Sequence, residues 1–154
     1  MKCFHSLNIT LVEIYGMSES SGPQTTGIDT AFRLGSAGRS IPGVTTRIDK
    51  PDPEGNGEIC MKRRNTSMGY LQQEDKTIET IDEQGWIRSG GIGKFEEGYL
   101  FITGRLKELI ITAGGKNIPP VLIEDALKAE LPCISNAMLI GEKRMFLCIL
   151  LVVA

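Results

Sequence analysis

Histidine and closely spaced cysteines are scarce in this chain, which excludes the commonest protein metal and redox sites. The one histidine, His5, lies near the start of the sequence, so a His-rich metal site is excluded and a Ser-His-Asp triad would have to use it. The four cysteines are scattered and form no Cys-x-x-Cys. This distribution is typical of a reducing compartment rather than of a disulfide framework. Cys60 and Cys148 lie in apolar runs, where we expect their free thiols to pack as small hydrophobic groups.

An excess of charge of one sign and a long hydrophobic run are also lacking. The net charge is −2, and the basic cluster at residues 62–64 is best interpreted as solvated, so no nucleic-acid partner is indicated. Residues 1–7 lack the apolar core of a signal peptide. The nine residues 146–154 are uniformly apolar, but a membrane-spanning helix needs about 20. They have the length of a buried strand, and because the sequence stops inside it we expect a piece of a longer protein.

Short strand signals separated by glycine and proline turns dominate the first two thirds of the sequence. The 154 residues, 41% apolar and 23% charged, suffice for one sizeable core or two small ones. Alternation and turn residues predict strands over residues 8–15, 44–48, 57–61 and 99–102. The first of these is predicted to stop at Gly16. Together they indicate a small, mostly antiparallel β unit over residues 33–104.

The pattern changes around Gly104-Arg105-Leu106-Lys107, where we place a domain boundary between residues 104 and 105. A short helix is expected over residues 75–82, and Ile118-Pro119-Pro120 opens a clearer helix that ends at Leu131. Its predicted apolar stripe consists of Val121, Leu122, Ala126, Leu127 and Leu131. Strands at residues 136–140 and 146–153 follow. The predicted fold class is α/β in a mixed α+β arrangement, with domains at residues 1–104 and 105–154.

The most informative segment is Tyr15-Gly16-Met17-Ser18-Glu19-Ser20-Ser21-Gly22-Pro23, which directly follows the first apolar run. Open α/β sheets bind ligands just past the carboxyl ends of their strands. A flat aromatic ring, a free backbone at Gly16 and a metal-competent carboxylate at Glu19 suit a nucleotide there. The alternative is an ordinary strand-to-loop turn.

Two later segments resemble, together with this one and in the same order, the adenylate-forming (AMP-binding) enzymes. They are residues 82–93, with the sequence Asp-Glu-Gln-Gly-Trp-Ile-Arg-Ser-Gly-Gly-Ile-Gly, and residues 102–120, which include Gly104-Arg105-Leu106-Lys107 and Gly114-Gly115-Lys116. The wording of residues 16–23 and 134–141 is most similar to the bubblegum-type long-chain acyl-CoA synthetases. The resemblance implies the carboxy-terminal part of the large AMP-binding domain followed by an incomplete lid domain.

The chemistry implied by the resemblance is activation of a fatty acid with ATP to an acyl-adenylate, then thioester formation with CoA. Both steps need close positioning, and the first needs magnesium. Tyr15 matches the aromatic that stacks on adenine, Gly16 a backbone contact, and Ser18 a hydroxyl near the phosphates. Glu19 matches the magnesium carboxylate, and one carboxylate suffices because phosphate and water complete the shell. The alternatives are a core aromatic for Tyr15 and a solvated acid for Glu19.

In the second predicted domain, Arg105 matches the arginine that contacts the ribose and phosphate side of the adenylate, since a guanidinium offers forked donors. The alternative for Arg105 is a surface ion pair with Glu108. Lys107 matches the hinge about which the lid rotates. Gly114 and Gly115 fit the loop that approaches the CoA side, or else a plain turn.

One position departs from the family. Ser89-Gly90-Gly91 stands where the resemblance implies Ser-Gly-Asp, whose Asp accepts hydrogen bonds from both ribose hydroxyls. Such bonds to a charged group are worth roughly 1.5–3 kcal/mol each. Their loss would weaken nucleotide binding by about two to four orders of magnitude.

The sequence therefore predicts a piece of an ATP-dependent fatty acid–CoA ligase that is inactive alone, because the upstream phosphate loop and acyl-binding region and the downstream lysine of the family lie outside these 154 residues. The alternatives are a non-enzymatic, truncated binding module, which Gly91 favours, and activation of another carboxylic acid. The resemblance implies ATP, magnesium, CoA and a fatty acid as ligands. It also implies a cytoplasmic location or attachment to the surface of the endoplasmic-reticulum membrane. Low solubility is expected, because residues 8–15 would expose an apolar edge.

Overall fold

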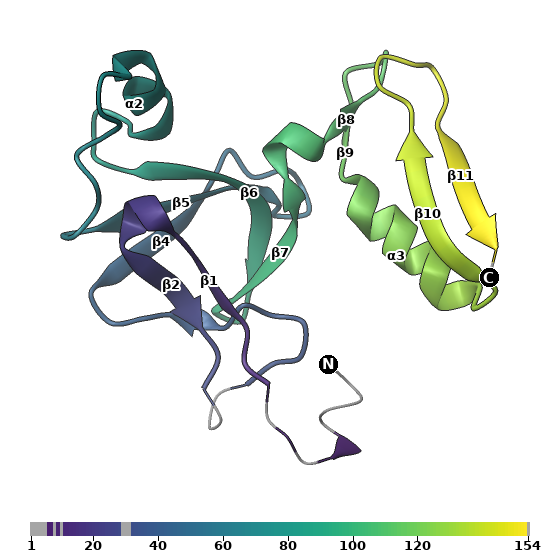
Figure 1. Cartoon of the computed structure of the whole chain (residues 1–154), viewed down its shortest axis with the longest axis horizontal. Helices are drawn as coiled ribbons and strands as arrows, with labels where there is room; N and C mark the ends of the chain where they lie inside the picture. Colours follow the sequence, from purple (N-terminus) through teal and green to yellow (C-terminus); the bar gives the residue numbers. More distant parts are fainter. Residues whose placement is uncertain (1–5, 8, 10, 29–31, 154) are drawn as a thin grey trace. The chain divides into compact units, whose positions relative to one another are not determined.

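The computed structural model describes residues 6–7, 9, 11–28 and 32–153, which form two compact units, Met1–Ile102 and Thr103–Ala154 (Figure 1). The division lies two residues before the boundary proposed from the sequence at 104/105. The assignment of these units to parts of two enzyme domains stays a prediction.

A four-stranded antiparallel sheet forms the centre of the first unit. Its strands follow one another in the order β4 (Val44–Asp49), β5 (Gly57–Arg63), β6 (Ile87–Glu96) and β7 (Tyr99–Arg105). Alternate residues of β5 point to opposite faces, and Ile59 and Met61 join Leu100 of β7 in a fully buried cluster. Tyr15, Met17 and Ile48 pack against this cluster. The β4, β5 and β7 segments confirm the sequence prediction, each extended by one to three residues.

Strand β6 was not predicted as a strand, although it is the longest one described. Its three glycines, Gly90, Gly91 and Gly93, resemble a loop in sequence. Gly90 adopts a φ of +67°, which favours glycine, whereas Gly91 and Gly93 have neighbouring groups close to the position of a β-carbon. A β-carbon on Gly93, for example, would crowd the carbonyl oxygen of Phe101 on β7 and the side chain of Ile59 on β5.

A smaller sheet with the order β1-β2-β3 carries the first motif. It is formed by β1 (Ile14–Met17), β2 (Gly22–Thr26) and β3 (Arg39–Ser40), and a 3-10 turn, η1 (Ser18–Ser20), joins the first two. The predicted strand over residues 8–15 is therefore wrong in its bounds. Residues 11–13 are not in a strand, and positions 8 and 10 lie outside the described residues. Gly16 lies inside β1 rather than at its end, and a side chain there would overlap the carbonyl oxygen of Gly22 on the paired strand β2.

One helix packed on one hairpin, in two layers, forms most of the second unit. Helix α3 (Pro120–Glu130) packs on β10 (Ile134–Ile140), which pairs in antiparallel register with β11 (Cys148–Val153). The short pair β8 (Ile110–Ile111) and β9 (Asn117–Ile118) precedes it. The helix is confirmed, but most of the predicted apolar stripe is wrong: Val121, Leu122 and Leu131 are 37–45% exposed, and Ala126 is exposed too. Leu127 is half-buried as predicted, together with Pro120, Ile123, Glu124 and Lys128 of the helix.

Some of the remaining fold predictions are confirmed and others are wrong. The mixed class is confirmed, and every pairing between named strands is antiparallel in the printed registers of the described chain. Helix α2 (Glu74–Thr80) begins one residue before the predicted segment 75–82 and ends two residues before its end, and Ile78 is 67% exposed. Cys60 is buried as expected, whereas Cys148 is exposed, as are four of the other five residues of β11. Within the described residues, no helix is long and apolar enough to cross a membrane.

Candidate functional site

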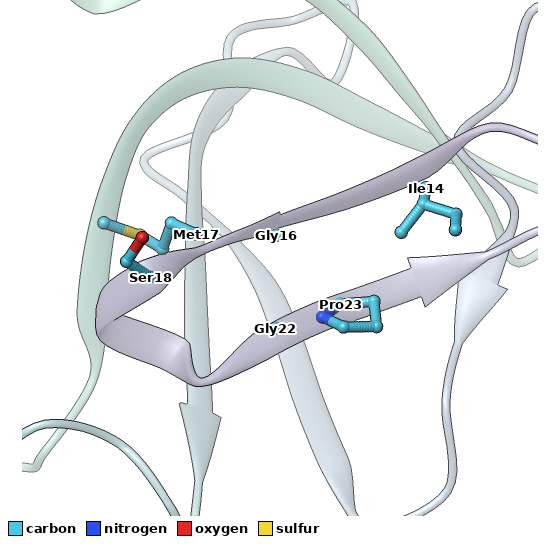
Figure 2. Close-up of a pocket in the computed structure, with 6 residues that line it drawn as sticks. All are labelled: Ile14, Gly16, Met17, Ser18, Gly22 and Pro23. Carbon is cyan, nitrogen blue, oxygen red and sulfur yellow. The ribbon is translucent and has the colours of Figure 1, made fainter.

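The β1–η1–β2 hairpin holds an open hollow of about 400 Å³, lined by Ile14, Gly16, Met17, Ser18, Gly22 and Pro23 (Figure 2). Two of the predicted nucleotide contacts, Gly16 and Ser18, therefore belong to its wall. The turn exists because Ser21 adopts a left-handed conformation and donates its backbone N–H to the carbonyl of Ser18 at 2.9 Å. The glycines leave the backbone exposed on this face, and Gly16 is exposed.

Ser20 holds the turn from inside, although nothing in the sequence singled it out. Its side chain is fully buried, accepts a hydrogen bond from the backbone N–H of Met17 at 3.3 Å, and donates to the carbonyl of Met17 or of Gly22 at 2.9 and 3.1 Å. A small hydroxyl that closes its own turn is a common local motif. The Ser-Ser-Gly sequence at residues 20–22 could have indicated a turn closed by a serine side chain.

Tyr15 does not line the hollow and packs on the core cluster of Ile59, Met61 and Leu100. Its hydroxyl donates a hydrogen bond of 2.8 Å to Oγ of Ser89 on β6. The described packing is that of the core aromatic which the sequence left as an alternative. An adenine contact by Tyr15 stays a prediction.

Ser89 connects three segments of the first unit. Its Oγ accepts hydrogen bonds from Tyr15 and from the backbone N–H of Gly91 at 3.1 Å, and it donates to the carbonyl of Ile59 at 2.6 Å. A hydroxyl can satisfy all three bonds because it has one proton and two lone pairs. Ser89 was recognised only as part of a motif, and its contact with Tyr15, 74 positions away, has no local sequence signal.

Gly91 stands directly beside Tyr15. A β-carbon on residue 91 would overlap the Tyr15 hydroxyl and would lie 3.3 Å from both Oγ of Ser89 and Cζ of Tyr15. With Tyr15 in this orientation, an Asp at position 91, as in the Ser-Gly-Asp motif, would overlap the Tyr15 hydroxyl.

Glu19 lies in η1 and is half-buried. Its Oε1 accepts a hydrogen bond of 2.5 Å from the hydroxyl of Tyr70, and its backbone carbonyl accepts one of 2.8 Å from the N–H of Ser67. The bond to Glu19, followed by burial, raises the pKa of the Tyr70 phenol above its ordinary value. Oε1 is the only carboxylate oxygen of Glu19 with a hydrogen bond among the described residues, so Oε2 can accept a further ligand.

A divalent cation fits this carboxylate only with help from another ligand. No group of three or more His, Cys, Asp or Glu side chains that could hold a metal occurs among the described residues. Magnesium commonly binds one or two protein carboxylates and completes its shell with phosphate oxygens and water. A lone half-buried Glu beside an open hollow therefore fits magnesium that arrives with a polyphosphate, and it does not fit a metal held by protein ligands alone.

The other four predicted residues lie in or at the edge of the second unit and are described with it. Arg105 ends β7 and Lys107 lies in the 3-10 turn η2 (Leu106–Glu108); both are exposed. No ion pair between Arg105 and Glu108 occurs in the described part of the chain, so the alternative role for Arg105 is not seen.

Gly114 and Gly115 form the exposed turn between β8 and β9. Its ends are closed by Thr112, whose N–H donates to the carbonyl of Lys116 at 3.1 Å. Gly115 has a φ of +76°, which favours glycine, and both positions border open space. The geometry fits a plain turn and leaves its backbone accessible, so a role toward CoA stays a prediction.

Comparison with solved structures defines the class of protein. The structure superposes on ATP-bound MatB from Rhodopseudomonas palustris with a TM-score of 0.80 and 30% identity, over 96% of this chain and 31% of that one. It also superposes on the o-succinylbenzoate CoA synthetase MenE from Bacillus subtilis, in complex with an acyl-adenylate intermediate, with a TM-score of 0.83 and 25% identity, over 99% of this chain and 33% of that one. The fold is therefore that of adenylate-forming enzymes.

Sequence comparison gives the family. Residues 1–71 match the profile described as AMP-binding enzyme, and residues 107–154 match the AMP-binding enzyme C-terminal domain. The chain is 59% identical to the long-chain-fatty-acid–CoA ligase ACSBG2 of Xenopus laevis and 55% identical to ACSBG1 of Homo sapiens, over 98% and 96% of its length. It spans about a fifth of the length of these curated relatives, 21% in both cases. The chain belongs to the AMP-binding enzyme family, which confirms the resemblance stated from its motifs.

Proposed function

We propose that this chain is part of an ATP-dependent, AMP-forming long-chain fatty acid–CoA ligase. The observation that carries the proposal is the 59% identity, over 98% of the chain, to a relative that bears this activity in its name. The hairpin agrees with it chemically. Exposed backbone at Gly16 and the hydroxyl-bearing Ser18 line one open hollow, and Glu19 follows Ser18 directly in η1, which suits a polar ligand with phosphate groups.

In this proposal each predicted residue has the role that the family resemblance implies. Gly16 and Ser18 offer a backbone group and a hydroxyl to the nucleotide, and Tyr15 stacks on its base. Glu19 would hold magnesium, which would offset the charge of the phosphates. Arg105 offers forked donors to ribose or phosphate oxygens. Lys107 is the hinge residue, and the turn at Gly114 and Gly115 borders the CoA path.

The 154 residues taken alone are expected to make little acyl-CoA. Stabilisation of the charge that develops as the adenylyl group is transferred from ATP and pyrophosphate leaves is usually the largest contribution to such catalysis. The phosphate loop and the lysine that supply it in the family are not among these residues. Fatty acid, ATP, magnesium and CoA are the proposed ligands, and the proposed location is the cytoplasm or the surface of the endoplasmic-reticulum membrane.

One observation favours a second candidate, a non-enzymatic module descended from such a ligase. Gly91 stands where the family has the Asp that accepts hydrogen bonds from the ribose hydroxyls. The Tyr15 hydroxyl occupies the space in which the side chain of that Asp would begin. A ribose bound here would have to do without that carboxylate.

A chimera decides between these candidates. Residues 1–154 replace the matching segment of the Xenopus laevis ligase, and the purified chimera is assayed for acyl-CoA formation from ATP, CoA and a long-chain fatty acid. We expect measurable activity that Glu19→Gln abolishes. The matched control is Tyr99→Phe, which changes a half-buried tyrosine outside the hairpin. A folded but inactive chimera would contradict the ligase proposal and favour the non-enzymatic module.

A further inference from the structure

The segment at residues 65–70 is fastened to the η1 turn that carries Glu19. Ser21 donates its hydroxyl to the carbonyl of Asn65 at 2.6 Å, and Ser67 donates its backbone N–H to the carbonyl of Glu19 at 2.8 Å. The third contact is the bond from the Tyr70 hydroxyl to the Glu19 carboxylate. Three hydrogen bonds thus join a turn to a segment about fifty residues later in the chain.

Tyr70 is itself held in place from the other side. Its backbone N–H donates to Oγ1 of Thr77 on α2 at 2.9 Å, and the same hydroxyl donates to the carbonyl of Gln73 at 3.0 Å. Gly69 makes this possible, because it adopts a φ of +132° and a β-carbon there would overlap the Thr77 side chain. The phenol is therefore presented to Glu19 by a segment anchored on a helix.

The hydrogen bond from Tyr70 affects the two oxygens of the Glu19 carboxylate differently. A phenol that donates to one carboxylate oxygen fixes the rotation of the carboxylate and leaves the other oxygen, Oε2, as a site for a cation. Outer partners of this kind orient ligating carboxylates, and their loss typically costs ten- to a hundredfold in metal affinity.

We propose that Tyr70 is a positioning residue, which holds the Glu19 carboxylate so that its second oxygen binds the divalent cation of a metal–nucleotide complex. The proposal rests on the proposed function, because it takes Glu19 as the cation ligand. It adds a residue that none of the three sequence motifs contains. Tyr70 acts through Glu19 and is given no contact with the nucleotide.

The test uses Mn²⁺ with ATP and the whole 154-residue chain labelled with ¹³C at the tyrosine ζ carbon. Mn²⁺ broadens NMR signals of nuclei close to it, so a cation on Glu19 must broaden the signal of Tyr70. We expect this broadening in the wild-type chain and its loss in Glu19→Gln. Tyr70→Phe identifies the signal, and thermal melts confirm that each variant is folded.

The affinity measurement separates positioning from folding. We expect Tyr70→Phe to weaken binding of Mn²⁺–ATP about tenfold, while binding of ATP in the presence of a chelator stays unchanged. Tyr99→Phe is the matched control and should alter neither value, since its ring packs under Arg39 and Phe retains that contact. A structural role for Tyr70 would weaken both binding reactions equally.

Failure of this inference differs from failure of the proposed function. No broadening of Tyr70 by Mn²⁺, with or without ATP, overturns the positioning role even if ATP binds. Unchanged Mn²⁺–ATP affinity in Tyr70→Phe overturns it as well. The cation site would be supported, and the ligase proposal contradicted, by a combination of two results. In the 154-residue chain Mn²⁺ alone would broaden the Tyr70 signal, and the chimera with Glu19 intact would bind no ATP.

Discussion

The hydroxyl of Tyr15 occupies the space in which a side chain on residue 91 would begin. Ser89 holds it there, because its Oγ accepts from Tyr15 at 2.8 Å and from the N–H of Gly91 at 3.1 Å. Gly91 has no positive φ, so its lack of a side chain is required by the neighbouring phenol rather than by its backbone conformation. Residues 15 and 91 therefore have to change together.

The first prediction follows from this pair. Gly91→Ala should lower the free energy of unfolding by about 1–3 kcal/mol, because the new methyl group collides with the phenol in a packed interior. Tyr15→Phe removes the colliding hydroxyl and should cost about 1 kcal/mol alone, for one lost hydrogen bond. The double variant should be more stable than the sum of the two losses predicts, by more than 0.5 kcal/mol, as expected for coupled neighbours (~0.5–3 kcal/mol).

Urea denaturation of the four proteins measures this coupling. Gly114→Ala serves as the control substitution, because a β-carbon at that position meets nothing within 4 Å. The same logic applies to function: Gly91→Asp in the chimera should raise nucleotide affinity only when Tyr15→Phe accompanies it. Additive losses in the double variant would contradict the steric coupling.

The second prediction concerns Cys60, which is 1% exposed in the middle of β5. Burial, followed by the nearby carboxylates of Glu58 and Asp49, raises the pKa of its thiol to about 11. A thiol reagent at pH 8 should therefore modify the exposed Cys133 and Cys148 rapidly, and Cys60 only after unfolding. Mass spectrometry of peptides from partially labelled protein provides the measurement.

The raised pKa of Cys60 also makes the free energy of unfolding depend on pH. The folded thiol keeps its proton until about pH 11, whereas the unfolded thiol loses it near 9.0. The unfolded state is thus favoured increasingly between these values, by something on the order of 2 kcal/mol at most. Cys60→Ala should lose less stability than the wild type between pH 8 and pH 11, roughly the window that the two pKa values define. Parallel curves for the two proteins would refute the assignment.

Local patterns in the sequence were sufficient for the elements whose signals are short-range. The two prolines before α3 and the glycine turns around β4 and β5 specify ends without reference to the rest of the chain. The family could be predicted because the sequence of residues 15–23 is specific and the later motifs follow it in the order typical of the family. Both were readable from neighbouring residues alone.

Non-local contacts account for what could not be predicted. Gly91 and Gly93 of strand β6 are glycines because Tyr15 and Ile59, which are distant in sequence, and the carbonyl of Phe101 on the next strand come close to them. Tyr70 meets Glu19 across 51 positions. Cys148 is apolar in its surroundings yet exposed, because only α3 and one neighbouring strand cover its hairpin in the described structure.

The third prediction concerns Asp82, which caps the turn between α2 and β6. Its Oδ1 accepts from the backbone N–H groups of Gln84 and Trp86, both at 2.9 Å, and its Oδ2 pairs with Arg47 at 3.2 Å. The backbone bond from Trp86 is the main cause of its lowered pKa. Arg47 in turn stacks on the Trp86 ring, with Cζ 4.3 Å from the ring centroid.

A carboxylate with a lowered folded-state pKa stabilises the protein above its unfolded pKa, and that stability is lost as the pH falls through the folded value. Asp82→Asn should therefore be less stable than the wild type at pH 7, and the difference should shrink below pH 4. Asp125→Asn is the control, because its pair with Lys128 is a surface contact with Asp125 63% exposed, and such pairs are worth about 0–1 kcal/mol. Thermal melts across this pH range would refute the cap if both variants behaved alike.

The last prediction concerns the second unit, where one carboxylate fastens α3 to β10. Oε1 of Glu124 accepts a hydrogen bond of 2.7 Å from the backbone N–H of Leu139, whose side chain is 6% exposed. Bonds to charged groups are worth about 1.5–3 kcal/mol, and removal of the acceptor leaves a half-buried amide without its partner. Glu124→Ala should destabilise this unit by that amount and speed hydrogen exchange at the Leu139 amide about ten- to a hundredfold. Glu130→Ala, an exposed acid at the end of the same helix, should leave both quantities nearly unchanged because it removes no such bond. Equal exchange rates at Leu139 in the two variants would show that packing alone, rather than the Glu124 carboxylate, holds α3 on the sheet.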